Sequence, residues 1–242
     1  MYAHIKNQLQ QIRFSTKSSS VFAKRFSSSS KWEPVPRAFQ RVMLPFVSAL
    51  LKKTARLFMH KVREAMESNG NHPMDGNVHV DEFVLGGREK GQVGRSYKAK
   101  KKKAIRAVEL TDDGKVKRMY AMRIKDFSSR SLQYMFVNHI SRDAKITTDK
   151  WRGYRPIAKA YDITQVDSNG GLNFKALHTM IHQIKSWIRT TYSWVSDFNI
   201  NRYFNEFCFR VNRTQGKATI FNNLLTKMVK KDKVYHQQII CN

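Results

Sequence analysis

The chain has 242 residues, with 45 Lys and Arg against 18 Asp and Glu, a formal net charge of +27. Hydrophobic residues make up 41% and aromatic residues 12%, which suffices for one buried domain plus a smaller appendage and excludes a globally disordered chain. A charge this unbalanced repels itself in a compact body unless a polyanion accompanies it. Nucleic acid is therefore the first partner to consider, and an anionic membrane surface the second.

No run approaches the roughly 18 apolar residues that span a bilayer, so a membrane role would be peripheral. The two cysteines, Cys208 and Cys241, are too few for a disulfide framework or a four-cysteine zinc site. They fit a reducing compartment, and Cys208, within an apolar run, is expected in the core.

Residues 1–36 contain no acidic residue before Glu33 and are rich in serine. Such an N-terminus is typical of an organellar transit peptide, but we interpret it as a disordered basic tail. Residues 37–72 have a helical pattern interrupted by Pro45. This helical segment is either a helix-turn-helix remnant or a cap on the next domain, and both interpretations remain open.

Residues 73–215 alternate between strand and helix patterns, and 216–242 form a basic tail. The expected strands are 77–85, 104–110, 116–124, 144–148 and 163–166, and the expected helices are 128–140, 154–161, 174–191, 196–213 and 220–230. This order predicts an α/β fold of the ribonuclease H-like type, a mixed five-stranded sheet flanked by helices, with its first and fourth strands side by side.

Two carboxylates end expected neighbouring strands. Asp81 and Asp149 are 68 positions apart, so only tertiary structure can bring them together. Carboxylates are the hard oxygen ligands that Mg²⁺ prefers, and two such ions catalyse phosphodiester chemistry. Glu82 competes with Asp81, because adjacent strand residues face opposite sides and only one of them should face the site. The alternative for Asp149 is a purely structural role, in which it caps the N-terminus of the following helix.

A third ligand is expected from the helix at 174–191. No Asp or Glu lies between Asp167 and Asp197, so His178 takes this place and shifts the preference from Mg²⁺ toward Mn²⁺. Lys185 follows seven residues later on the same helix face. His182, one turn after His178, competes for its role.

Nine Lys or Arg lie between Arg88 and Arg106 against one acid, Glu89. We interpret this run as a surface that tracks DNA phosphates rather than a merely solvated loop. The expected DNA contacts are Lys100, Lys101, Lys102, Lys103, Arg152 and Lys185. Glu206, among aromatic neighbours, is expected to be structural and to pair with Arg210 or Arg213.

Four segments, VDEFVLGG, GRSYKAKKKKAIRAVE, TDKWRGY and YFNEFCFRVNR, closely resemble insertion-sequence transposases of the DDE superfamily, in the ISXO-like branch. The resemblance covers about residues 54–215. It implies a ribonuclease H-like catalytic domain, two-metal DNA cleavage and strand transfer with Mg²⁺ or Mn²⁺, and a homo-oligomer on transposon ends and target DNA. It also implies a bacterial, cytoplasmic and nucleoid-associated protein.

Carried over by motif, Asp81 and Asp149 match the first two catalytic acids. His178 stands where the branch carries Glu, Asn or sometimes His, and Lys185 matches a basic residue that contacts a phosphate or the transposon end. The cysteine-rich zinc ribbon and full helix-turn-helix usual in the branch are missing, so the chain looks truncated at its N-terminus.

Three functions follow from these observations. The first is an active transposase, and the second is a catalytically decayed copy that only binds DNA. The third, if residues 1–36 are a transit signal, is a basic organellar nucleic-acid-binding protein. Metal-dependent nicking separates the first two, and a mature N-terminus near residue 30 would identify the third.

Overall fold

A computed structural model describes residues 52–86, 101–192, 194–214 and 216–239. Several of the expected features lie outside these ranges. They are the tail at 1–36, residues 37–51 of the helical segment, residues 88–100 of the basic run, and Cys241. The described residues all belong to one unit, Val47–Asn242.

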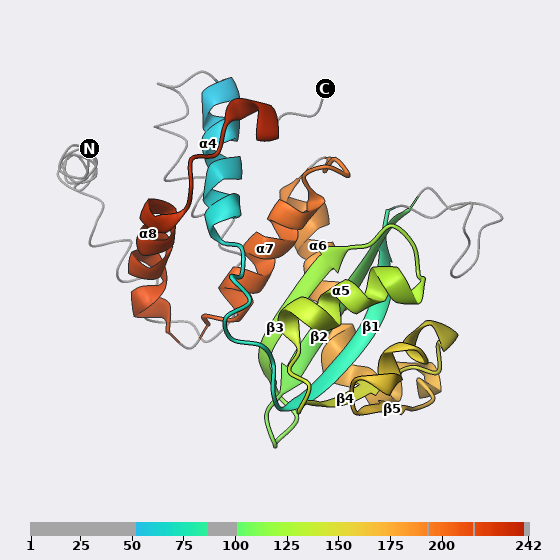
Figure 1. The fold of residues 1–242 in the computed structure, drawn as a ribbon. Helices are drawn as coiled ribbons and strands as arrows, with labels where there is room; N and C mark the ends of the chain where they lie inside the picture. Colours follow the sequence, from blue (N-terminus) through green and yellow to red (C-terminus); the bar gives the residue numbers. More distant parts are fainter. Residues whose placement is uncertain (1–51, 87–100, 193, 215, 240–242) are drawn as a thin grey trace. The chain divides into compact units, whose positions relative to one another are not determined.

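The sheet has five strands in the order β3-β2-β1-β4-β5 (Figure 1). Its first three strands are β1 (Asn77–Leu85), β2 (Lys102–Leu110) and β3 (Val116–Arg123), and β2 pairs antiparallel with both of the others. The other two, β4 (Lys145–Thr148) and β5 (Ile163–Gln165), extend the sheet in parallel from β1. This mixed sheet, with β1 beside β4, confirms the predicted ribonuclease H-like fold.

The helices are α4 (Lys52–Ala65), α5 (Ser129–His139), α6 (Lys175–Thr191), α7 (Ile200–Val211) and α8 (Ile220–Lys230). The hydroxyl of Ser128 caps α5 by accepting a hydrogen bond from the Ser131 amide, which removes one orphan donor of the first turn. In these ranges, no helix combines the length and the apolar character that a bilayer crossing needs.

The prediction of a helix at 154–161 is wrong. The segment forms two short 3₁₀ turns instead, η1 (Arg152–Tyr154) and η2 (Ile157–Lys159). Pro156 stands between them, and its missing N–H and its ring prevent a continuous α-helix. A third 3₁₀ segment, η3 (Asn169–Phe174), precedes α6 and contains two glycines at positive φ.

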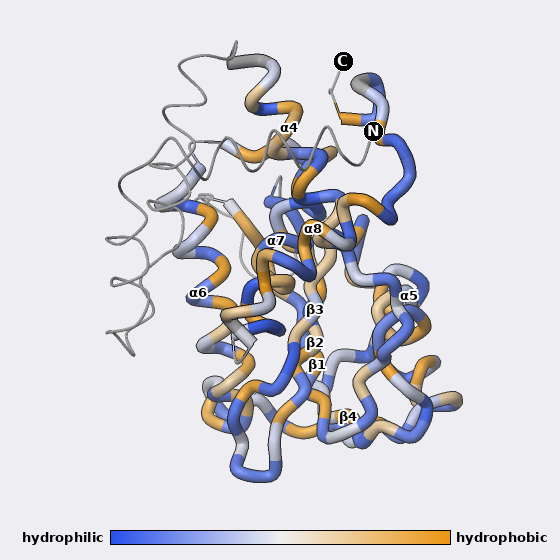
Figure 2. Tube along the Cα trace, turned by 90° about the vertical axis from the view of Figure 1, so that its left-hand side faces the viewer, coloured by the Kyte–Doolittle hydropathy of each residue, from blue (hydrophilic) through white to orange (hydrophobic). Residues whose placement is uncertain are grey.

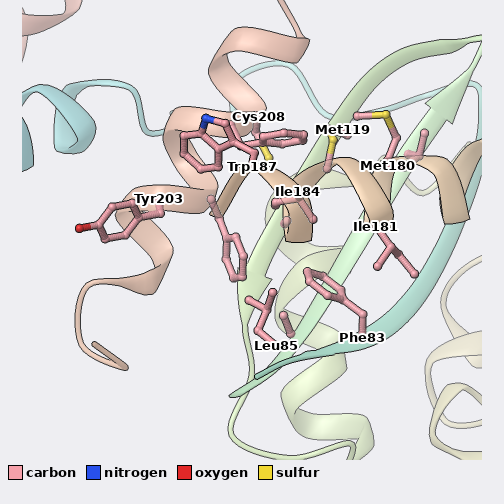
Figure 3. Close-up of a cluster of buried hydrophobic side chains, with 14 of the residues drawn as sticks. Phe83, Leu85, Met119, Met180, Ile181, Ile184, Trp187, Tyr203 and Cys208 are labelled. Carbon is pink, nitrogen blue, oxygen red and sulfur yellow. The ribbon is translucent and has the colours of Figure 1, made fainter. Parts of the chain in front are cut away.

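Alternation along β1 divides the core into two layers. Val78 and Val80 pack with Leu132 and Phe136 of α5. Phe83 and Leu85 point to the other side, where they pack against α6 and α7 (Figure 3). Trp187 and Cys208 belong to this second layer, which confirms the expected core position of Cys208. Because helices cover both faces, any polar side chain on the central strands needs a partner within the protein.

The amphipathic pattern of α6 explains how it covers the sheet. Its tube alternates between hydrophobic and hydrophilic turns (Figure 2), and its buried residues are Leu177, Met180, Ile181, Ile184 and Trp187. These recur at three- and four-residue spacing, so they form one stripe facing the core. The polar residues of α6 that flank this stripe, among them His178 and Lys185, are only partly buried.

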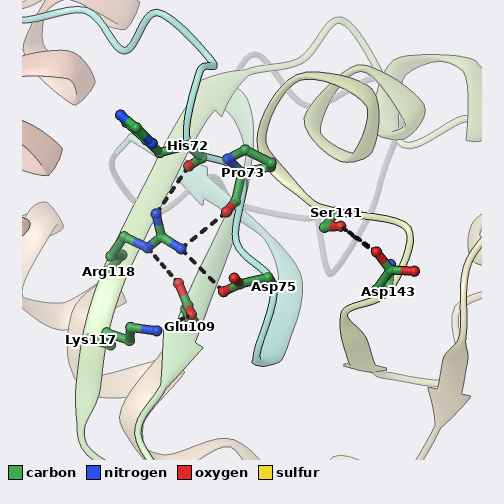
Figure 4. A network of polar contacts seen from close by, with 8 residues as sticks. All are labelled: His72, Pro73, Asp75, Glu109, Lys117, Arg118, Ser141 and Asp143. Atoms are coloured by element: carbon green, nitrogen blue, oxygen red, sulfur yellow. Dashed lines mark hydrogen bonds and ion pairs between the residues drawn. The ribbon is translucent and has the colours of Figure 1, made fainter.

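The chain enters β1 through a segment held by Arg118 of β3. The Arg118 guanidinium donates to the His72 and Pro73 carbonyl oxygens at 3.0 and 3.1 Å and to Glu109 Oε2 at 2.5 Å (Figure 4). Lys117 Nζ also donates to Glu109, at 2.8 Å. This network ties the segment before β1 to β2 and β3.

A second buried network joins α4 to α7. Arg63 Nε donates to Glu206 Oε2 at 2.8 Å, and Arg210 Nη2 donates to Glu206 Oε1 at 2.6 Å. The expected pairing of Glu206 with Arg210 is confirmed, and Arg63 is an additional partner. Helix α8 packs on the same region, where Ile220, Leu224 and Met228 lie against Val62, Met66 and Phe209.

Candidate metal centre

The parallel pairing of β1 with β4 aligns the two aspartates. The last pair in this ladder is Val80 with Thr148, so one further step of the same register would set Asp81 opposite Asp149. There β4 ends and β1 continues to Leu85. Beyond the end of β4, β1 thus has no β4 partner, and both aspartates lie at this step in the sheet, which we call the notch.

Glu82 joins the pair. One oxygen from each of Asp81, Glu82 and Asp149 lies within 4.8 Å of the others. Asp81 lies on the face of β1 that packs on α6, and Glu82 lies on the opposite face. We expected only one of these adjacent carboxylates to face the site, yet both reach it. The reason is that no β4 residue flanks β1 here, so side chains from both faces can bend into the notch.

A turn stabilised by side-chain hydrogen bonds holds Asp149. Its Oδ1 accepts a hydrogen bond from the Trp151 backbone N–H at 3.0 Å. The Gln165 side-chain amide donates to the carbonyl oxygens of both Asp149 and Trp151. The indole of Trp151 in turn donates to the Phe127 carbonyl oxygen at 3.0 Å. Asp149 therefore leaves the sheet in a fixed direction.

Arg106 of β2 lies directly across from Asp81 in the antiparallel ladder. Its side chain is 0% exposed, and its Nη2 lies 3.4 Å from Asp81 Oδ2. Burial lowers the pKa of Arg106 to about 9, although the negative charge of Asp81 opposes this shift. The sequence interpretation placed Arg106 at the end of a surface basic run, and this is wrong. The signal was available, because Ala104, Arg106 and Val108 share the face of β2 toward α6.

His178 and Lys185 both lie on the side of α6 that faces Arg106. Burial lowers the pKa of each, and the positive charge of Arg106 lowers it further. His178 is half-buried against η3, where a Cβ built on Gly171 would come within 3.3 Å of its ring. Within the described chain, His178 is not part of the tight acidic group. This shift of its pKa favours the neutral imidazole, which is the form that binds metals.

The described basic residues differ in their surroundings. Lys102 pairs with Asp197 at 2.8 Å, and the ammonium of Lys103 lies 5.9 Å from the ring centre of Phe127. Lys101 is half-buried, and Arg152 is exposed beside the ring of Trp151. Arg152 thus follows Asp149 by three positions, in the η1 turn after β4.

Among the cavities of the described residues, two lie at the ends of β1 and β4. One of about 260 Å³ is lined by Asp149, Lys150, Trp151, Asp167 and Ser168. A larger one of about 320 Å³ involves Asn77 and Lys145, the first residues of β1 and β4. The larger cavity is therefore at the opposite ends of these strands, away from the acidic group. We relate the smaller one to the site because Asp149 lines it.

The donor set fits a divalent metal. Three carboxylate oxygens are the hard ligands that Mg²⁺ and Mn²⁺ select. Oxygens on one Mg²⁺ at its usual ligand distance lie within roughly 4.2 Å of one another, so a group within 4.8 Å needs only small side-chain movements to close on an ion. The hypothesis of a metal site is therefore compatible with the geometry.

Comparison with protein families matches residues 73–212 to the ISXO2-like transposase domain. A search of curated proteins finds no match. The matched region contains the whole sheet, the acidic group and helices α5 to α7, and it covers more than half of the chain. The chain therefore belongs to the ISXO2-like transposases of the DDE superfamily.

Proposed function

We propose that this transposase cuts DNA at the ends of an insertion sequence and joins the freed 3′-hydroxyl to target DNA, using divalent metal. The observation that carries the proposal is the convergence of Asp81, Glu82 and Asp149 within 4.8 Å, from positions far apart in the chain. Bound Mg²⁺ or Mn²⁺ would activate the attacking oxygen and stabilise the leaving one. The carboxylates would hold the metal, and the site as proposed takes two ions.

Around this group, the side chains of α6 and of the basic run take supporting roles in the proposal. His178 supplies a neutral ligand from α6, and Lys185 contacts a phosphate or the transposon end. Arg152 and the lysines at 100–103 neutralise further phosphates. The catalytic domain spans residues 73–215, and it works as a homo-oligomer on transposon ends and target DNA, associated with the nucleoid in the cytoplasm.

The experiment is a nicking assay with Mn²⁺ on a duplex that carries the element's ends. We expect the unsubstituted protein to nick this duplex and Asp149→Asn to abolish nicking. The matched control is Asp167→Asn, since Asp167 lines the same cavity but lies outside the acidic group. Nicking that survives Asp149→Asn would remove Asp149 from the site and sink the proposed mechanism.

The alternative is a catalytically decayed copy that binds DNA without cutting it. It is favoured by the buried Arg106 beside Asp81 and by the absence of an acid between Asp167 and Asp197. The same assay decides between the two, because a decayed copy would shift the duplex on a gel and leave it intact at every Mn²⁺ concentration.

A further inference from the structure

Arg106 is a cation that the fold cannot release. Its side chain is 0% exposed and belongs to a central strand with neighbours on both sides. A lysine or arginine at a protein surface can swing into water when a metal arrives, but Arg106 would have to leave the core layer formed by α6 and β2. Its positive charge therefore stays beside Asp81 whether or not a metal ion is bound.

The guanidinium of Arg106 is poorly satisfied apart from its contact with Asp81. Its Nε and Nη1 atoms find no hydrogen-bond acceptor within the described chain, although a guanidinium has five donor hydrogens. Unpaired buried donors are costly, so electrostatic attraction must offset this cost. The nearby carboxylates provide it, since the charges of Asp81 and Glu82 both favour the protonated form of Arg106.

A metal ion and Arg106 would therefore interact with the same carboxylate, that of Asp81. An ion bound to Asp81 would take electron density from the Oδ2 atom that now lies 3.4 Å from Arg106. It would also bring two positive charges close to a guanidinium that is itself buried, where charges repel more strongly than in water. Lys185 adds to this repulsion, because it lies near enough to Asp81 and Arg106 for both to shift its pKa.

We propose that Arg106 competes with the divalent metal for the carboxylate of Asp81 and thereby weakens metal binding at the acidic group. The inference rests on the proposed metal site and adds a positioning residue to it. Arg106 holds Asp81 in place while the site is empty, and this contact must loosen before Asp81 can serve as a ligand.

The experiment measures Mn²⁺ affinity by calorimetric titration, without DNA. Arg106→Gln and Arg106→Met remove the charge, and we expect each to bind Mn²⁺ at least about tenfold more tightly, equivalent to about 1.4 kcal/mol. Arg106→Lys keeps the charge and should stay close to the unsubstituted protein. Arg202→Gln is the matched control, because it removes a largely buried guanidinium beside the carboxylate of Glu64, outside the acidic group and away from β1.

Unchanged or weaker Mn²⁺ binding in both charge-removing variants would overturn the inference. If neither variant folds, judged by circular dichroism, the Nε–H signal of Arg106 in the unsubstituted protein is followed by NMR during a Mg²⁺ titration. A shift that saturates with Mg²⁺ supports competition, and a signal that does not move refutes it. Failure of the proposed function is distinct, since it would appear as nicking unaffected by Asp149→Asn even where Arg106→Gln tightens Mn²⁺ binding.

Discussion

Glu206 joins α4 to α7 through a buried network, and replacing it tests how much that network contributes. In Glu206→Gln the volume is kept and the charge is lost. Arg63, with 5% of its side chain exposed, and Arg210, with 17%, then lack their counter-ion. Breaking a buried pair by removing one partner costs about 3–5 kcal/mol, because the remaining charge is left uncompensated.

The matched control is Glu67→Gln. Glu67 pairs with Lys231 at 2.9 Å, but its side chain is 50% exposed, and surface pairs of this kind contribute less than about 1 kcal/mol. Urea unfolding followed by circular dichroism gives both free energies of unfolding. For a protein of this size, the loss at Glu206 should lower Tm by on the order of 10 °C.

The pH dependence of the same variant provides a second readout. Burial alone would raise the pKa of Glu206, but the charges of Arg210 and Arg63 and their hydrogen bonds lower it. A carboxyl group with a lowered pKa stabilises the fold above its unfolded value of about 4.3 and loses this contribution as the pH falls through the folded pKa. Glu206→Gln should lack this acid loss. A cost below about 1 kcal/mol at neutral pH would refute the reasoning.

Two further predictions concern the turn after β4 and the buried histidines. A Cβ at Gly153 would lie 2.5 Å from the indole nitrogen of Trp151. Gly153→Ala should therefore displace this ring, destabilise the fold by about 1–3 kcal/mol and shift the tryptophan fluorescence. Unchanged fluorescence and stability would contradict this prediction. Burial lowers the pKa of His60 and His139 to about 4, so the unfolded state alone takes up protons below about pH 6.5. Stability should therefore fall between about pH 6.5 and 4, and His139→Phe, which keeps the stacking on Tyr120, should reduce that fall in a pH series of unfolding free energies. An identical pH profile would argue against the role of His139.

The sheet was predictable because its strands carry strong local signals. Residues 77–85 alternate and end at glycine, and the observed β1 has the same bounds. The chain order of strands and helices then restricts the topology to few choices, which is why the neighbouring positions of Asp81 and Asp149 could be inferred. A helix was also predicted near residues 220–230, and the observed α8 has these bounds.

The parts that failed depend on tertiary context. Strand alternation separates Asp81 from Glu82, but it does not show where a neighbouring strand stops, and that end of β4 decides which side chains reach the notch. The burial of Arg106 likewise follows from helices on both sides of β2, which a charge count along the chain does not register. His178 could be placed on the correct side of α6 from spacing, while its distance from the acids depends on how η3 sets the helix against the sheet.

Helices α4 and α8 pack on α7 but lie outside residues 73–212, the span of the family match. The residues that stabilise the fold therefore extend beyond the residues that match the family. A chain shortened to residues 73–212, the span of the family match, would lose Arg63 from beside Glu206 and expose Phe209, which is now 2% accessible. Such a fragment would keep every acid of the notch, but Glu206 would retain only Arg210 as its ion-pair partner and an aromatic side chain on α7 would lose its cover. Trimming for expression or crystallisation should therefore retain both flanking helices, since aggregation of the shorter form would say nothing about its chemistry.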